Sequence, residues 1–515
     1  MTSTTASGYP TPLVISGARV LDPLEPQARP SSQDVFVESG RITHVGPAGE
    51  VPFPSGARVI DGRRMLAIPG LISAHYHSHD TLLKGAFDSM PLEFWFLHAI
   101  PPNYPKRSRA EIRARVLIGA LECLKAGITT VQDMVTVYPF DPDHVDAILE
   151  AYDDIGIRAV FAMQVGDAPA QHGVPFWKEV MPPELFAQTS SSVKPTGRAA
   201  ELLAVVEGEF LRHDGKHPLV TWGLGPATPE NCTEEFLAGV ARLSRDRNLP
   251  VFTHVYESKA NVITARNHYA ADSGSLISHL NRVGLLNERL TIAHGVWLTQ
   301  SEIEQVARSG ANVALNPTSN LKSRSGVAPI AAYSRAGAQV ALGTDNSSCS
   351  DVQNMFQAMK LFTLLSAASA PDTTSPGAHE AFQAATLGGA RALGLGGRVG
   401  RIAVGMQADI TLIALDDPSF VPLNDAVRQL ALTEPGRSVR TVIVEGRIVI
   451  EDGRCQTIDE QSLYEEVERL MPVLEADLAN IRKRNAALLP YVTAAHHKTV
   501  AAQVGLDRFV AGDPA

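Results

Sequence analysis

The sequence predicts an α/β fold built around a closed parallel barrel. After residue 66, short apolar runs alternate with segments whose apolar residues recur at helical spacing, such as 109–126 and 233–248. The alternation occurs eight times, which is typical of an eight-stranded β/α (TIM-type) barrel. The predicted strands lie within residues 66–75, 127–134, 156–163, 219–227, 250–257, 290–297, 311–319 and 339–346.

The two ends of the chain show a different pattern. Short alternating strands with glycine between them occur before the barrel and again near the C-terminus. We therefore expect residues 11–66 and 397–456 to form one small β-sandwich domain, with the barrel over 67–396 between its two parts.

A C-terminal helical extension is predicted over residues 457–515. From about residue 458 the sequence has the pattern of a long amphipathic helix. Its apolar face needs a partner surface, either on this chain or on another subunit, and we expect a homo-oligomer.

The composition excludes several classes of protein. A net charge of -10, with 44% hydrophobic and 19% charged residues, fits an ordinary globular enzyme and gives no basic surface for nucleic acid. The four cysteines form no CxxC pair, which argues against a disulfide framework or a thiolate zinc site. The N-terminal sequence lacks a signal-peptide pattern, and no uncharged apolar run of about 18 residues occurs. We expect a cytoplasmic protein that does not bind membranes.

Three histidines alternate in the stretch PGLISAHYHSHD, residues 69–80. In an extended strand His75, His77 and His79 would project from one face, because the side-chain period is two. A lone His-x-His pair is a weak metal signal, because histidines at strand ends are often satisfied by packing or hydrogen bonds.

Further candidate ligands follow other predicted strands. The fifth ends in His254, with Glu257 three residues on, the sixth in His294 and the eighth in Asp345. Each residue could be structural by itself, and Asp345 could cap the next helix. Together, at the barrel end where active sites lie, they predict a metal site with nitrogen and oxygen donors.

These residues stand in motifs that resemble those of the amidohydrolase superfamily, in its cytosine deaminase-like branch. That branch also contains s-triazine hydrolases and S-adenosylhomocysteine deaminases. The resemblance runs from about residue 12 to 455, and its motifs are PGLISAHYH, TWGLGPATPENCTEEFL, FTHVYES, IAHGVWLT, ALNPTSNLKSRSGVAPI, ALGTDNSSCSDVQNMF and GRIAVGMQADI.

The resemblance implies a role for each strand-end residue. One divalent metal would be bound by His75, His77, His254 and Asp345, with an activated water between the metal and Asp345. The catalytic residues would be Asp345, Glu257 as the proton-transferring acid/base, and His294, which would orient the water or stabilise developing charge.

A single metal is expected, because two-metal relatives generally carry a carboxylated lysine on the fourth strand and LVTWGLGPA has none. We expect zinc, and iron or manganese also suit these donors.

The sequence departs from the family pattern at positions that bear on the substrate. Ala227 stands where many relatives have a histidine, and Asn103 or Tyr104 where adenosine-type enzymes have a glutamate. His79 stands where relatives often have proline. We expect adenosine-type nucleosides to be poor substrates, and the candidate substrate-binding residues are His79, Trp95, Tyr104, Ala227, Asn316 and Asn320.

The predicted function is that of a metal-dependent aminohydrolase. Its activated water would attack an amidine-like C–N bond of a nitrogen heterocycle such as a pyrimidine, purine, pterin or s-triazine. An amidase acting on a urea or carbamate, or a triazine dechlorinase, is the alternative, because all of these share the strand-end ligands. A non-catalytic scaffold is a remote alternative, since no ligand is lost.

Overall fold

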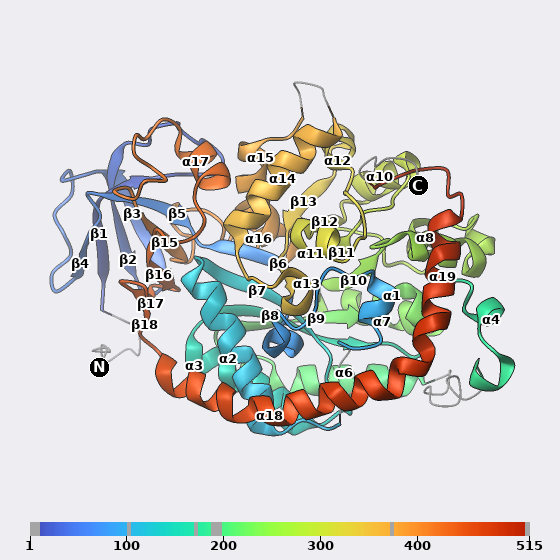
Figure 1. Cartoon of the computed structure of the whole chain (residues 1–515). Helices are drawn as coiled ribbons and strands as arrows, with labels where there is room; N and C mark the ends of the chain where they lie inside the picture. The colour runs from blue at the N-terminus through green and yellow to red at the C-terminus, as the bar shows by residue number, and fades with distance from the viewer. Residues whose placement is uncertain (1–10, 100–104, 169–173, 187–197, 371–374, 510–515) are drawn as a thin grey trace.

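The computed structural model describes residues 11–99, 105–168, 174–186, 198–370 and 375–509. Nine strands form a parallel sheet in the order β13-β12-β11-β10-β9-β8-β7-β6-β14, surrounded by helices (Figure 1). β13 pairs with β12, and β14, which two residues separate from β13, pairs with β6. The arrangement is therefore consistent with a TIM-type barrel. The strands are β6 (Leu71–His77), β7 (Ile128–Val135), β8 (Arg158–Val165), β9 (Val220–Pro226), β10 (Val251–Val255), β11 (Leu290–His294), β12 (Asn312–Leu315), β13 (Gln339–Leu342) and β14 (Asp345–Asn346).

The eighth predicted strand is divided into β13 and β14. Between them Gly343 lies so close to its neighbours that an added Cβ would be 2.3 Å from Asn316 Oδ1 and 2.8 Å from His75 Cβ. The backbone N–H of Thr344 donates to Ser73 Oγ over 3.1 Å. The division therefore brings Asp345 next to β6.

Helices cover the outside of the parallel sheet, and their buried apolar residues pack against it in one large core. Many begin at a side-chain cap, as where Ser108 accepts from Glu111 N and Thr299 from Glu302 N. The main barrel helices are α2 (Arg109–Lys125), α3 (Pro142–Ile155), α6 (Ala199–His213), α7 (Glu234–Arg247), α8 (Lys259–His268), α9 (Leu276–Arg282), α10 (Gln300–Ser309), α12 (Ile330–Ala336), α14 (Met355–Ser369), α15 (Ala378–Gln383) and α16 (Gly389–Ala392).

Short helices lie in several of the connections between the strands. They are η1 (Ser78–Leu83), α1 (Leu92–Trp95), α4 (Trp177–Val180), η4 (Pro229–Asn231), η5 (Ala270–Asp272), α11 (Pro317–Lys322) and α13 (Ser347–Ser350). The π-helix η6 (Ala384–Gly388) continues α15.

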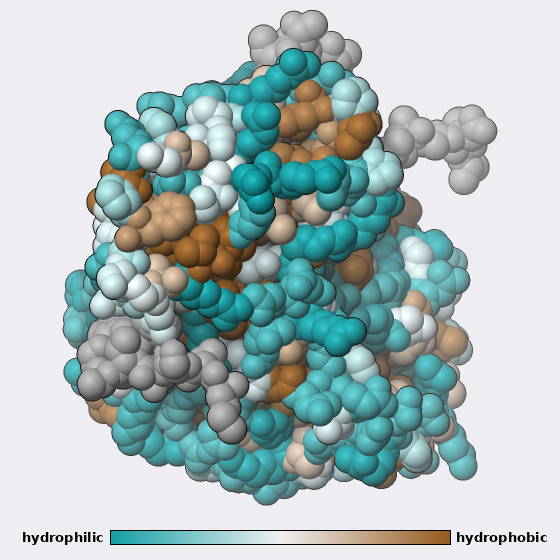
Figure 2. All heavy atoms as spheres, turned by 90° about the vertical axis from the view of Figure 1, so that its left-hand side faces the viewer, coloured by the Kyte–Doolittle hydropathy of each residue, from teal (hydrophilic) through white to brown (hydrophobic). Residues whose placement is uncertain are grey.

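Strands from both ends of the chain share a second, mixed sheet of nine strands, whose apolar residues form a core of their own. The sandwich arrangement and the exact domain boundaries stay predictions. Figure 2 shows the face of the molecule that carries this sheet, where hydrophilic residues predominate and apolar residues form a few patches. The strands are β1 (Leu13–Val20), β2 (Ser32–Glu38), β3 (Arg41–Pro47), β4 (Arg58–Asp61), β5 (Met65–Pro69), β15 (Ile410–Ala414), β16 (Val439–Val444), β17 (Arg447–Glu451) and β18 (Arg454–Cys455), with helix α17 (Ala426–Leu432) between β15 and β16.

A buried ion pair joins the two sheets. Arg158 at the start of β8 donates from Nε and Nη2 to the Asp409 carboxylate over 3.0 and 3.1 Å, and the two side chains are 2% and 1% exposed. Asp409 also accepts from the backbone N–H of Glu445. Neither charge can reach water if its partner is lost.

We expect Asp409→Asn to lower the free energy of unfolding by about 3–5 kcal/mol, because it leaves the Arg158 charge buried without a counter-charge. Urea denaturation measures the change. The control is Asp61→Asn, which breaks an exposed pair with Arg63 and should change little. Equal stability of the two variants would show that the buried pair contributes nothing specific.

The C-terminal extension forms two helices, α18 (Glu460–Asn485) and α19 (Leu489–Ala501), joined by the 3₁₀ turn η7 (Ala486–Leu488). They run beside α2 and then past α8, α1 and α4 (Figure 1). Leu474, Leu478 and Ile481 of α18 pack with Leu83 and Trp95. The partner surface of the apolar face is therefore on this chain, while the homo-oligomer stays a prediction. Among the described residues, no helix is both long and apolar enough to cross a bilayer.

Candidate active site

The strand-end residues converge at one end of the parallel sheet. His75 Nε2 lies 3.2 Å from His77 Nε2, which in turn lies 3.3 Å from His254 Nε2. Asp345 Oδ1 is 3.5 Å from His75 Nε2 and 3.4 Å from His77 Nε2. The strand-end donors form two sets that share His75: one also contains His77 and His254, and the other also contains His294 and Asp345.

The second nitrogen of two of these imidazoles is fixed by the backbone. His77 Nδ1 contacts the carbonyl oxygen of Met134, and His254 Nδ1 contacts that of Ala227. A carbonyl only accepts, so each Nδ1 carries a proton and, in a neutral ring, each Nε2 presents a lone pair to its neighbours. Such backbone support is usual for histidines that bind metals.

Burial favours the neutral form of two of these imidazoles, whereas the hydrogen bond and charge of Asp345 raise the pKa of the third, His77, in spite of its burial. Burial lowers the pKa of His75 to about 4 and that of His254 well below its usual range. Lone pairs of neutral imidazoles and a carboxylate oxygen, gathered within van der Waals distance, repel one another unless a cation lies among them. The donor set therefore fits one divalent metal.

A second pair of groups lies beside these donors. Glu257, 9% exposed, has Oε2 3.6 Å from His294 Nε2, which is 3.9 Å from Asp345 Oδ2. Burial, with Asp345 nearby, raises the pKa of Glu257 to about 7 in spite of the opposing effect of His294. A carboxyl group with such a pKa can both accept and return a proton near neutral pH.

Two asparagines that are candidate substrate contacts lie at His294, and the shorter contact, to an amide oxygen, places a proton on Nδ1 of the ring. This Nδ1 lies 2.9 Å from Asn320 Oδ1 and 3.4 Å from Asn316 Nδ2. The backbone at His294 and Asp345 has φ of +73° and +60°. Non-glycine residues rarely adopt this conformation, and it often marks functional sites.

The other candidate residues lie around the metal donors. Trp95 is buried, and its indole N–H donates to Ser348 Oγ over 2.7 Å. Ala227 follows β9 and supplies the carbonyl at His254. Asn103 and Tyr104 lie outside the described residues.

His79 does not continue the face formed by His75 and His77, so the expectation of three histidines on one strand face is wrong. β6 ends at His77, and residue 78 begins η1. The reason is Asp133 in β7, which accepts from both the backbone N–H and the hydroxyl of Ser78 and turns the chain.

Sequence reasoning missed residues that fix the Asp345 segment. The buried Asp80 carboxylate accepts from the backbone N–H groups of Ser347 and Ser348 over 3.0 and 3.1 Å, and Ser319 Oγ donates to Asp345 Oδ2. In the sequence, only its place beside the histidine motif distinguishes Asp80. Its partners, Ser347 and Ser348, lie more than 260 residues further along the chain.

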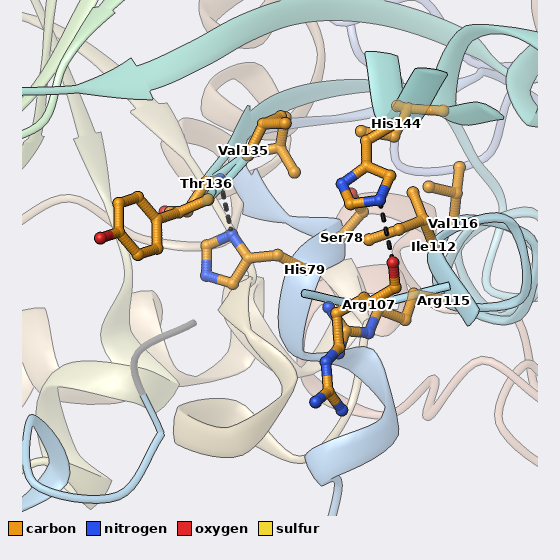
Figure 3. Close-up of a pocket in the computed structure, with 12 residues that line it drawn as sticks. Ser78, His79, Arg107, Ile112, Arg115, Val116, Val135, Thr136 and His144 are labelled. Atoms are coloured by element: carbon orange, nitrogen blue, oxygen red, sulfur yellow. Dashed lines mark hydrogen bonds between the residues drawn. The ribbon is translucent and has the colours of Figure 1, made fainter. Parts of the chain in front are cut away.

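A pocket opens next to His77, between η1, α2, the end of β7 and α3 (Figure 3). Its polar lining includes Ser78, His79, Arg115, Thr136, Tyr138 and His144. The ring centroid of His79 lies 5.0 Å from that of His77, so the pocket adjoins the metal donors.

Comparison with known proteins identifies the family. Residues 66–449 match the model of the Amidohydrolase family. The chain belongs to the amidohydrolase family. It is therefore a metal-dependent hydrolase that acts on carbon–nitrogen bonds other than peptide bonds.

Three similar proteins illustrate the range of this family. A 5-methylthioadenosine/S-adenosylhomocysteine deaminase of Moorella thermoacetica is 33% identical over 438 residues, or 85% of this amidohydrolase and 94% of that protein. A zinc-bound adenosine deaminase structure from Xanthomonas campestris has a TM-score of 0.79 at 26% identity, covering 91% and 99% of the two chains. Atrazine chlorohydrolase from Arthrobacter aurescens, complexed with zinc, has a TM-score of 0.75 at 25% identity, covering 89% and 100%.

Proposed function

We propose that this amidohydrolase is a deaminase of a nitrogen heterocycle and that its metal is zinc, bound by His75, His77, His254 and Asp345. The observation that carries the proposal is the Glu257 carboxyl group, buried beside His294 and next to the four convergent donors. Similarity to deaminases and to two zinc-bound enzymes supports it.

When bound, the metal acts as a Lewis acid that makes water a nucleophile near neutral pH. Glu257 takes a proton from the attacking water as its oxygen bonds to the amidine-like carbon. The same carboxyl group then returns the proton to the leaving nitrogen, the C–N bond breaks and ammonia departs. The oxygen added to the carbon loses its remaining proton, the ring nitrogen gains one, and a carbonyl group beside a ring N–H remains. Its pKa near 7 suits both halves of this cycle.

Asp345 and His294 position the reacting groups. Asp345 is held by Ser319 and lies beside the histidines, where its carboxylate can orient the attacking water. Because Asn320 Oδ1 lies 2.9 Å from Nδ1 of His294, the other ring nitrogen stays directed at Glu257 and Asp345. We assign to His294 the alignment of the water and the stabilisation of charge on the attacked heterocycle.

Loss of chloride from a chlorinated triazine is the second candidate function, because the fold matches that of atrazine chlorohydrolase along nearly the whole of that chain. The test is a panel of aminated pyrimidines, purines, pterins and triazines, with chlorinated triazines, incubated with zinc-loaded protein. Ammonia release supports the deaminase, and chloride release without ammonia refutes it in favour of the second candidate.

When adenosine and S-adenosylhomocysteine are added to that panel, we expect both to have a lower kcat/KM than a compact, flat heterocycle. Ala227 offers no imidazole to the substrate, and each missing hydrogen bond weakens binding by about 0.5–1.5 kcal/mol, or a factor of about 2–13. The similarity to adenosine-type deaminases makes this comparison decisive. A nucleoside that proves to be the best substrate would show that other residues supply the sugar contacts.

A further inference from the structure

His79 lies at the border between the metal donors and the adjoining pocket. It is 6% exposed, and its Nδ1 accepts a hydrogen bond of 3.1 Å from the backbone N–H of Thr136, which directly follows β7 (Figure 3). It is the third histidine of the HYHSH motif, and neither metal binding nor proton transfer uses it.

The Thr136 contact decides where the proton of the His79 ring is. A backbone N–H can only donate, so Nδ1 of His79 must present its lone pair. The single ring proton of the neutral imidazole is then on Nε2. A second proton on Nδ1 would place two donors against each other. The backbone at the end of β7 therefore makes Nε2 of His79 a hydrogen-bond donor.

The direction of this donor follows from the fold. In Figure 3 the Nε2 side of the ring is turned away from Thr136 and from the chain that carries it. In the part of the chain that the structure describes, no side chain or carbonyl accepts from Nε2, and His79 lines the pocket. The ring also lies against His77, at a centroid separation of 5.0 Å. A molecule held at the metal donors is the natural acceptor.

We propose that His79 is a specificity-determining residue that donates from Nε2–H to a lone-pair acceptor of the substrate. The inference rests on the proposed deaminase function and narrows its substrate class. The heterocycle carries a ring nitrogen or an exocyclic oxygen on the edge that faces η1 and the end of β7. A C–H or N–H group at that position leaves the donor unpaired, which disfavours such compounds.

Two variants separate this role from a structural one. His79→Asn keeps an oxygen that can accept from Thr136 N–H but is too short to supply the donor. His79→Gln, the matched control, carries an amide N–H at the reach of Nε2. With the best substrate of the panel we expect His79→Asn to raise KM about 3- to 10-fold with little change in kcat, and His79→Gln to stay within about 3-fold of the parent. Zinc content should be unchanged in both.

A deaza analogue, in which a C–H group replaces the acceptor nitrogen, completes the test. The parent enzyme should lose affinity for this analogue, whereas His79→Asn should treat the substrate and the analogue alike. The proposal would be overturned if His79→Asn weakened the binding of the substrate and of the analogue by the same factor, or if His79→Asn lost zinc. In either case His79 would act only through His77.

The tautomer can be tested without any substrate. NMR spectra of zinc-loaded protein labelled with ¹⁵N-histidine are compared for the parent and His79→Asn, and the signal that the variant lacks is assigned to His79. We expect this signal to be that of a ring protonated at Nε2 and unprotonated at Nδ1. The opposite tautomer would refute the inference even if the protein is a deaminase. The expected tautomer in a protein that deaminates nothing in the panel would refute the proposed function instead.

Discussion

Asp345→Asn and His75→Ala should each purify with far less than the about one divalent metal per chain that we expect for the parent protein. His75 belongs to both sets of donors at the strand ends, and Asp345 belongs to one of them and lies 3.5 Å from His75. The asparagine amide keeps the shape of the side chain and loses the charge that balances the cation. Activity should fall with metal content, and elemental analysis of dialysed protein measures it.

Two surface variants serve as controls. Asp246→Asn and His497→Ala make the same chemical changes at exposed positions, away from the strand ends. Both should retain the metal content of the parent. Stoichiometric metal in both Asp345→Asn and His75→Ala would refute the assigned ligands.

Glu257→Gln should keep the metal and lose most turnover, by about 10²- to 10⁴-fold. The amide has nearly the size of the carboxyl group, but it cannot take a proton from water or return one to the leaving nitrogen. Measured together, kcat and metal content separate this effect from damage to the site. The control is Glu209→Gln on α6, another buried glutamate, paired with Arg212 away from the strand ends.

The control should keep turnover close to that of the parent. If Glu257→Gln also turned over near the parent rate, the proton transfer would have to be assigned to another group. A variant that lost metal as well as activity would instead make Glu257 part of the metal site.

The strand-end histidines could be predicted from the sequence because the strand period is a local pattern and the barrel can be inferred from the alternation of strands and helices. The period of a strand places His75 and His77 together, and the barrel places His254, His294 and Asp345 at the same end. The structure brings all five side chains together.

The break after His77 could not be predicted in the same way. It depends on Asp133, which lies 55 residues further along the chain and accepts from Ser78. The support of the Asp345 segment by Asp80 likewise joins residues more than 260 positions apart. Hydrogen bonds over such separations leave no periodic pattern in a single sequence.

The C-terminal extension shows the same limit. Its amphipathic pattern predicts a helix and a buried face, but not which surface covers that face. Leu478 and Ile481 are buried against Trp95 because the barrel carries α1 to that place. The turn η7 (Ala486–Leu488) between α18 and α19 changes the direction of the chain. After α19, Arg508 donates to the carbonyls of Val296 and Leu298, which follow β11.

The pairing of β5 with β15 imposes an order on the synthesis of this protein. Met65 pairs with Ala414 and Pro69 with Ile410, so roughly 340 residues must leave the ribosome before β5 gains its partner on this side. At about 5–20 residues per second, this takes roughly 20–70 s. Throughout that interval the nascent chain carries an unpaired, apolar strand edge. The N-terminal strands are therefore made first, but β5 gains this partner only after the whole barrel has been synthesised.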